Sequence, residues 1–196
     1  MTFLPSEAQE PKSKSNYTMP LPEGRTKVRV IGSAIVGYEG WSNEGGKKTP
    51  IRYKMGEQPE YGQDGKEPKY FWAFVVWNYN QERLQIMAVT QKTIRGQIQA
   101  LIDDEAWGSP LEYDLSITRT GKEMNDTEYQ VMPTPKVKLD PTISGQYLAN
   151  KIDLQVWMSG GDPFEQKAPQ TAVSGDAGYN PQTVAEDIDM LNNTVQ

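Results

Sequence analysis

The most apolar stretch of the chain is residues 69–79, KYFWAFVVWNY, and its pattern is that of a β-strand. Successive side chains on a strand point to opposite faces, and here both faces carry aromatic residues. Such a run is typical of a strand that is buried on both sides. Two interpretations stay open: both faces are core, or Tyr70 and Trp72 face a ligand groove together with residues 52–54.

Hydrophobic periodicity predicts further elements on both sides of this strand. Residues 25–41 read as a long strand that Gly32 and Ser33 interrupt with a bulge or bend. Residues 90–108 read as a helix that Thr90 caps, with apolar side chains at helical spacing. The remaining expected elements are a Gly/Pro-rich loop at 42–68 and strands at 83–90, 111–120 and 127–133.

Five strands with one helix between the third and the fourth predict a mainly β protein with the layout of an OB-fold, a five-stranded and partly open barrel. The expected long loop lies between strands 1 and 2. The predicted domain organisation is a flexible N-terminal arm at 1–24, an OB-fold domain at 25–138, a short helical extension at 139–158 and an acidic flexible tail at 159–196.

The composition excludes several kinds of chemistry. The 196 residues include no cysteine and no histidine, so a disulfide, a thiolate nucleophile and the commonest zinc ligand and general base are all absent. The sequence also lacks a phosphate-binding glycine motif. We expect no cofactor, no metal site and no enzymatic activity. A metal-dependent nuclease that uses Asp103, Asp104 and Glu105 is the less favoured alternative.

The start of the chain does not read as a signal peptide, and no apolar run approaches the ~20 residues of a membrane span. We expect a protein without membrane contact that acts in the cytoplasm. The net charge is −6, yet acidic residues are in clear excess only after residue 139, and the stretch from 25 to 138 is nearly neutral. The middle of the chain therefore retains enough lysine and arginine to contact an anionic ligand.

Aromatic residues and cations alternate through this middle stretch. Aromatic rings can stack on bases, and lysines and arginines can contact phosphates, so the pattern predicts binding of single-stranded DNA, with RNA as an open alternative. The candidate nucleic-acid-binding residues are Lys27, Arg29, Tyr38, Trp41, Lys47, Lys48, Arg52, Tyr53, Lys54, Lys69, Tyr70, Trp72, Trp77 and Arg119. A structural or assembly protein that uses the same barrel for protein contacts is the main alternative.

The run FWAFVVWNYNQERLQIMAVTQKTIRGQIQALIDDEAWGSPLEYDLSITRTGKEMNDTEYQV resembles the core of tailed-phage single-stranded DNA-binding proteins, and PEGRTKVRVIGSAIVGYEGW resembles their first strand. The resemblance covers roughly residues 20–138. It implies an OB-fold that coats single-stranded DNA during phage replication and recombination in the host bacterial cytoplasm. The helix-destabilising protein of T-even phages carries a zinc site that this chain, without cysteine and histidine, does not have.

The resemblance also implies an acidic tail that recruits replication or recombination proteins. The tail could instead occupy the cationic groove of its own chain and compete with DNA. Its acidic and apolar residues lie several positions before the end, NNTVQ, whereas many bacterial single-stranded DNA-binding proteins end directly on such a tip. The candidate partner-binding residues are Glu186, Asp187, Ile188, Asp189, Met190 and Leu191.

Overall fold

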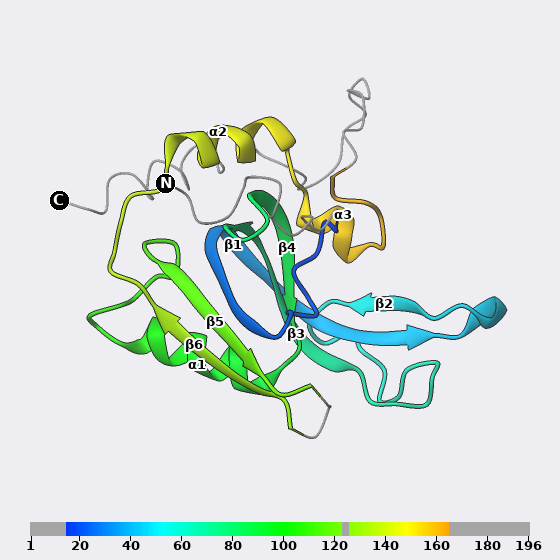
Figure 1. The fold of residues 1–196 in the computed structure, drawn as a ribbon. Helices are drawn as coiled ribbons and strands as arrows, with labels where there is room; N and C mark the ends of the chain where they lie inside the picture. Colours follow the sequence, from blue (N-terminus) through cyan, green and yellow to red (C-terminus); the bar gives the residue numbers. More distant parts are fainter. Residues whose placement is uncertain (1–14, 123–125, 165–196) are drawn as a thin grey trace, which may run out of the picture.

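The computed structural model describes residues 15–122 and 126–164. In this part of the chain, six antiparallel strands form one sheet, and three α-helices pack around it (Figure 1). The strands are β1 (Gly24–Ser42), β2 (Thr49–Tyr53), β3 (Lys69–Asn78), β4 (Arg83–Val89), β5 (Asp114–Thr120) and β6 (Glu128–Pro133). The helices are α1 (Lys92–Asp103), α2 (Pro141–Asn150) and α3 (Leu154–Met158), with a 3₁₀ turn η2 (Glu44–Gly46) before β2.

The long strand β1 is the centre of the sheet, whose order is β4-β3-β1-β5-β6, with β2 paired to β1 off this path. β3 follows β1 along most of its length, while β5 pairs with residues 24–29 and β2 with residues 38–42. The predicted interruption at Gly32 is confirmed: Ile31 lies opposite Val75 but Ile35 lies opposite Ala73, so β1 contains a bulge. Gly32 has a φ of +72°, and a Cβ there would lie 2.8 Å from Oη of Tyr147 in α2.

The sheet is not closed into a barrel, because the register contains no pairing between β4 and β6 among the described residues. Other groups satisfy these two edges. Thr18 N–H donates to Ile86 O over 3.0 Å at the β4 edge. At the β6 edge, Gln97 of α1 donates to Tyr129 O and accepts from Val131 N–H. The fold is therefore mainly β as expected, with an open six-stranded sheet in place of five strands.

Two apolar clusters lie on opposite faces of the sheet, and the alternation of β3 divides its residues between them. Phe74 and Val76 join the cluster that includes Ile94 and Ile98 of α1. Phe71 and Trp77 join the cluster that α2 and α3 cover. α1 therefore covers one face of β3, and the C-terminal helices α2 and α3 cover the other.

The N-terminal segment departs from the expectation of a mobile arm that reaches residue 24. Residues 15–18 run along β4, where Ile86 N–H donates to Asn16 O over 2.9 Å. Leu21 is 1% exposed in the cluster beneath α1. Arg119 Nη1 donates to the Leu21 carbonyl over 2.8 Å, so β5 also holds this segment.

Three further local expectations needed correction. The region 42–68, expected to be a loop, contains the strand β2. Its sequence includes Pro50 and is flanked by glycines, so it did not indicate a strand; β2 forms because it pairs with the end of β1. The helix expected from residue 90 begins at Lys92, and its N-cap is Gln91, which makes no side-chain capping bond. α3 follows α2 as a second helix of the extension, capped by Asp153.

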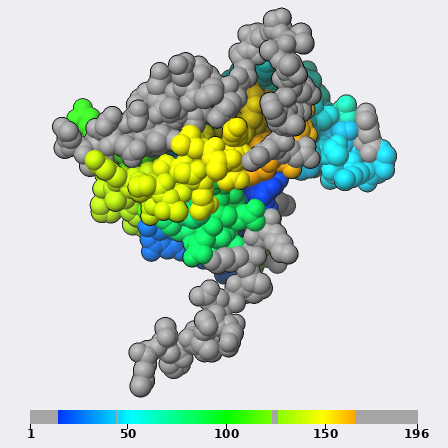
Figure 2. Space-filling model, turned by 90° about the horizontal axis from the view of Figure 1, so that it is seen from above, coloured from blue at the N-terminus to red at the C-terminus, as the bar shows by residue number. Residues whose placement is uncertain are grey.

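Residues 38–69 form a projecting arm, which consists of the end of β1, β2 and the connection to β3. Figures 1 and 2 show this arm in cyan, extending away from the body of the molecule. At its base, α3 packs on the sheet over Gly37, where an added Cβ would lie 2.8 Å from Cε of Met158. No helix among the described residues combines the length and the apolar character required to cross a membrane.

Candidate nucleic-acid interface

Three adjoining hollows on the surface share lining residues and form one continuous path. The central hollow, of about 460 Å³, lies where the arm meets the body and is lined by Trp41, Arg52 and Tyr17, among others. Its wall includes Trp157 of α3, and its floor includes Phe71. The central hollow thus lies on the sheet face that α3 partly covers.

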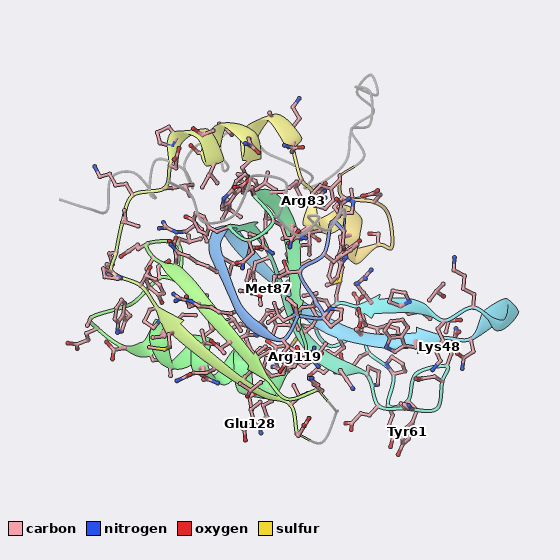
Figure 3. All side chains as sticks on the ribbon, viewed as in Figure 1. Lys48, Tyr61, Arg83, Met87, Arg119 and Glu128 are labelled. Atoms are coloured by element: carbon pink, nitrogen blue, oxygen red, sulfur yellow. The ribbon has the colours of Figure 1, made fainter. Side chains whose placement is uncertain are left out.

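The arm hollow, of about 240 Å³, continues from the central hollow because Glu39 and Trp41 line both. Its cations are Lys48, Lys66 and Lys69, and all three are exposed. Figure 3 shows Lys48 on the projecting arm. The three lysines give the outer end of the path donors for phosphate oxygens.

The N-terminal hollow, of about 480 Å³, adjoins the central hollow on its other side, and Tyr17 is among the residues that line both. Arg119 of β5 and the β3–β4 turn residues Asn80 and Gln81 line it as well. Arg119 Nη1 donates to the Leu21 carbonyl, and its Nε is buried without a hydrogen-bond partner among the described residues, so Arg119 contributes to the hollow mainly through the positive charge of its guanidinium. The path therefore runs from the arm, past the N-terminal segment, to the end of β5.

The path combines exposed rings with an excess of cations. Trp41 is 39% exposed and Tyr17 is 42% exposed, which leaves both rings accessible for stacking. Five cationic and three acidic side chains line the three hollows, the acidic ones being Glu39, Asp64 and Glu67.

Arg52 joins the arm to α3 at the centre of the path. Its guanidinium carbon lies 3.6 Å from the centre of the Trp157 ring, and Nη1 donates to the Trp157 carbonyl over 3.0 Å. Its Nε lies 3.5 Å from Oε2 of Glu39. Burial lowers the pKa of Arg52. Burial also raises the pKa of Glu39, and the nearby positive charge of Arg52 offsets part of this increase. Since its side chain is only 10% exposed, Arg52 acts mainly by positioning the walls of the path.

Four predicted aromatic residues lie together on the opposite face of the sheet. Tyr38 lies directly opposite both Tyr53 and Tyr70, so three tyrosines form a row across β2, β1 and β3. The Tyr38 and Tyr70 ring centres are 5.4 Å apart, and Trp72 Nε1 donates to Tyr70 Oη over 3.1 Å. Arg95 of α1 lies over the Tyr70 ring, with its guanidinium carbon 4.7 Å from the centre. We call these four aromatic side chains the tyrosine row.

This arrangement separates residues that the sequence grouped. Tyr53 lies in the tyrosine row with Tyr70 and Trp72, but its neighbour Arg52 points to the other face, as strand alternation requires. The expectation of one groove formed by residues 52–54, Tyr70 and Trp72 was therefore wrong.

Arg29 and Trp77 are buried inside the fold, and Lys27, whose side chain is 39% exposed, pairs with the same carboxylate as Arg29. Arg29 is 1% exposed, and its Nε lies 2.6 Å from Oδ1 of Asp114. Lys27 Nζ lies 2.8 Å from Oδ2 of the same carboxylate and 4.6 Å from the Tyr79 ring centre. Trp77 is 8% exposed in the cluster under α2 and α3. Arg29 and Trp77 are thus structural, contrary to their assignment as surface contacts.

The Asp114 network has clear electrostatic consequences. Burial alone would raise the pKa of Asp114, but hydrogen bonds from Lys27 and Arg29 hold it below its usual value. Tyr79 Oη donates to the same carboxylate over 3.1 Å, and burial together with Asp114 raises the pKa of Tyr79 to about 12. This network ties β1 and β3 to β5.

The remaining predicted residues divide as follows. Lys47 and Lys54 are exposed on the arm but line none of the three hollows. The six partner-binding residues predicted at 186–191 lie outside the described residues.

Two residues of the path, Tyr17 and Lys66, were missed. Tyr17 belongs to an alternating apolar series with Met19 and Leu21, and this series could have indicated a strand-like segment that packs on the domain. For Lys66 the sequence gives no comparable signal, because only the fold of the arm places it beside Lys48 and Lys69.

The carboxylates of the nuclease alternative, Asp103, Asp104 and Glu105, are exposed at the end of α1. Asp103 accepts a hydrogen bond from Gln99, and Asp104 accepts one from Ala106 N–H. No group of three or more acidic side chains that could hold a metal ion occurs within residues 15–122 and 126–164.

Comparison with known proteins identifies no relative. No protein-family model, no curated protein and no solved structure matches the chain. A functional assignment therefore has to be argued from the surface itself.

Proposed function

We propose that the chain is a non-enzymatic protein that binds single-stranded DNA largely independently of sequence. The observation that carries this proposal is the continuity of the three hollows, which bring Trp41, Lys48, Lys69 and Arg119 from separate elements onto one path. Exposed rings and cations along an extended hollow are the two features that single-strand binding requires.

The topology supports the same conclusion. We propose to count β3 and β4 as strands 2 and 3 of an OB-type arrangement: the strand order and the helix between β4 and β5 support this, while the pair that would close the barrel does not form among the described residues. OB-folds bind oligonucleotides on strands 2–3 and on the loops between strands 1 and 2 and between strands 4 and 5. The path crosses this region, from the arm to Arg119 near the end of β5.

The chemistry of the path explains the expected lack of sequence preference. Every base offers a π-face to Trp41 and Tyr17, and every nucleotide offers a phosphate to the lysines of the arm hollow. Duplex DNA keeps its bases stacked on one another, so it cannot use the rings. We therefore expect the protein to prefer single strands, and a direct comparison with oligo(rU) decides between DNA and RNA.

A role in phage replication or recombination, within the host bacterial cytoplasm, is part of this proposal and rests on the sequence resemblance. Recruitment of partner proteins through residues 186–191 rests on the same resemblance. Removing these residues from the full chain should leave the affinity for oligo(dT) unchanged at low salt, where charges are least screened, if their role is recruitment alone, and should raise it if the tail competes with DNA for the path.

The test is a fluorescence anisotropy titration of end-labelled oligo(dT), with duplex DNA of equal length as the control, at two salt concentrations. The proposal predicts tight binding of oligo(dT), weaker binding of the duplex, and an affinity that falls as salt rises. If the protein does not bind oligo(dT) even at low salt, the proposal is contradicted. That result would favour an OB-type domain that binds protein.

A further inference from the structure

A second, separate groove lies on the sheet face of the tyrosine row, between Trp72, the β1 bulge and α1. Its volume is about 380 Å³, within the about 300–1,000 Å³ range of ligand sites. The lining is mainly apolar, and it includes Val36, Phe74, Ile98 and Ile102. We call this hollow the Trp72 groove.

Large apolar side chains are accessible in the Trp72 groove. Val36 and Ile102 are each 39% exposed, although aliphatic side chains of this kind are usually buried in a protein interior. Gly32, Ser33 and Ala34 of the bulge line it with small side chains, which leaves the groove open on that side. Trp72 is held in place by its hydrogen bond to Tyr70, so one wall is rigid before any ligand arrives.

The charges around the Trp72 groove indicate what it would bind. Among the residues that the structure describes, no lysine or arginine lines it, in contrast to the five cations of the three hollows that form the path. Asp103 lies at the rim of the groove, because its Oδ1 accepts a hydrogen bond over 2.8 Å from Nε2 of Gln99, which lines the groove. Asp104 and Glu105 follow it in the chain, and all three carboxylates are exposed. An acidic rim repels phosphates and attracts cations.

We propose that the Trp72 groove is a docking site for an amphipathic segment of a partner protein that carries large apolar side chains next to lysine or arginine. The apolar side chains enter the groove beside Trp72 and Ile102, and the cations pair with the acidic rim. This mode corresponds to the recognition of short segments by apolar grooves. The site is independent of the DNA path, so the protein can hold a partner while it binds DNA.

The test is selection of a random peptide library against the full-length protein. Enriched peptides should combine aliphatic or aromatic residues with Lys or Arg. Their affinity should fall about tenfold or more for Ile102→Glu, which places a charge in the groove. Leu148→Glu is the matched control, because Leu148 is 42% exposed on α2 and lines none of the hollows described here.

A second variant tests the rim. Replacing Asp103, Asp104 and Glu105 together by Asn, Asn and Gln should weaken peptide binding and reduce its salt dependence. Failure to enrich any peptide, equal binding to Ile102→Glu, or selection of acidic peptides would overturn the proposal. Competition between the selected peptide and oligo(dT) would also overturn it, because the groove would then belong to the DNA path. Binding of oligo(dT) by Ile102→Glu at wild-type affinity would support two separate sites.

Discussion

The guanidinium of Arg52 lies over the Trp157 ring, with its central carbon 3.6 Å from the ring centre, and so connects the arm to the C-terminal helix α3. The two residues are far apart in the sequence, and neither was expected to contact the other. Because Arg52 also hydrogen-bonds the Trp157 carbonyl, its planar fork serves both contacts at once. The central hollow owes its shape to this connection.

Replacing Arg52 with lysine should therefore disturb the path while keeping its charge. A lysine ammonium cannot both stack on the indole and reach the carbonyl in the same geometry. We expect Arg52→Lys to weaken binding of oligo(dT) by a few-fold and to leave the dependence of affinity on salt unchanged, because the number of cations is unchanged. A variant that binds with wild-type affinity would show that the connection does not position the path.

Trp41 should contribute by stacking. It is 39% exposed, so Trp41→Ala should change the free energy of unfolding little while it removes about 1–3 kcal/mol of base stacking, which is about 5-fold to 150-fold in affinity. Tyr61→Ala is the matched control. Tyr61 is also an exposed aromatic residue of the arm (Figure 3), at 62%. It lines none of the hollows. Equal losses from both variants would contradict the assignment of the path.

The lysines of the arm hollow should determine the salt dependence. Each phosphate contact with a single strand contributes about 0.7 to the slope of log affinity against log salt concentration. Replacing Lys48, Lys66 and Lys69 by glutamine removes three such contacts and should therefore reduce the magnitude of the slope by about 2. The control is the glutamine variant of Lys136, Lys138 and Lys151, which removes the same charge from outside the path. An identical change of slope in both variants would indicate a general effect of net charge.

Asp114 should make the stability of the protein depend on pH in the acidic range. Folding lowers the pKa of Asp114 below its reference value of 3.8. The ionised carboxylate therefore adds to the free energy of unfolding at pH values above 3.8, and this contribution is lost as the pH falls through the folded-state pKa. Asp114→Asn leaves the buried Arg29 without its carboxylate and should cost about 3 kcal/mol at neutral pH. The difference from wild type should shrink below about pH 4, in urea unfolding measured at several pH values. A difference that is constant with pH would show that the ion pair is not its source.

Gly37 tests how tightly α3 packs on the sheet. An added Cβ would lie 2.8 Å from Cε of Met158 and 2.6 Å from the Tyr53 carbonyl oxygen, and the carbonyl is fixed by the backbone. We expect Gly37→Ala to lower the free energy of unfolding by about 1–3 kcal/mol. Gly96→Ala, in an exposed position of α1 with open space around it, should instead stabilise the protein by up to about 1 kcal/mol. Thermal unfolding of both variants measures the contrast, and equal effects would contradict the packing.

The sequence was informative about strands and α1, because local alternation reports directly on burial. The alternation of residues 69–79 separated Phe74 from Phe71 correctly, and the spacing of Ile94 and Ile98 indicated the buried side of α1. The bulge was visible from Gly32. Local sequence did not indicate β2, since five residues with a proline become a strand only when the end of β1 pairs with them.

The candidate site was predicted less completely, because it depends on contacts between distant residues. The sequence could not show that Arg29 pairs with Asp114, or that Arg52 and Tyr53 point away from each other across the sheet once β2 forms. Tyr17 entered the path only because its segment packs along β4. Residue type suggested stacking and phosphate contacts, while the topology decided which residues can make them together.

The most direct test of the central claim is the quenching of intrinsic tryptophan fluorescence by oligo(dT), in the wild-type protein and in Trp41→Phe and Trp72→Phe. The account predicts salt-sensitive quenching in the wild type, loss of most of this signal in Trp41→Phe, and its retention in Trp72→Phe, because Trp41 lines the path and Trp72 lies on the other face. Quenching that disappears in Trp72→Phe and persists in Trp41→Phe would place DNA on the tyrosine row. No quenching of the wild type at low salt would contradict single-stranded DNA binding by this path.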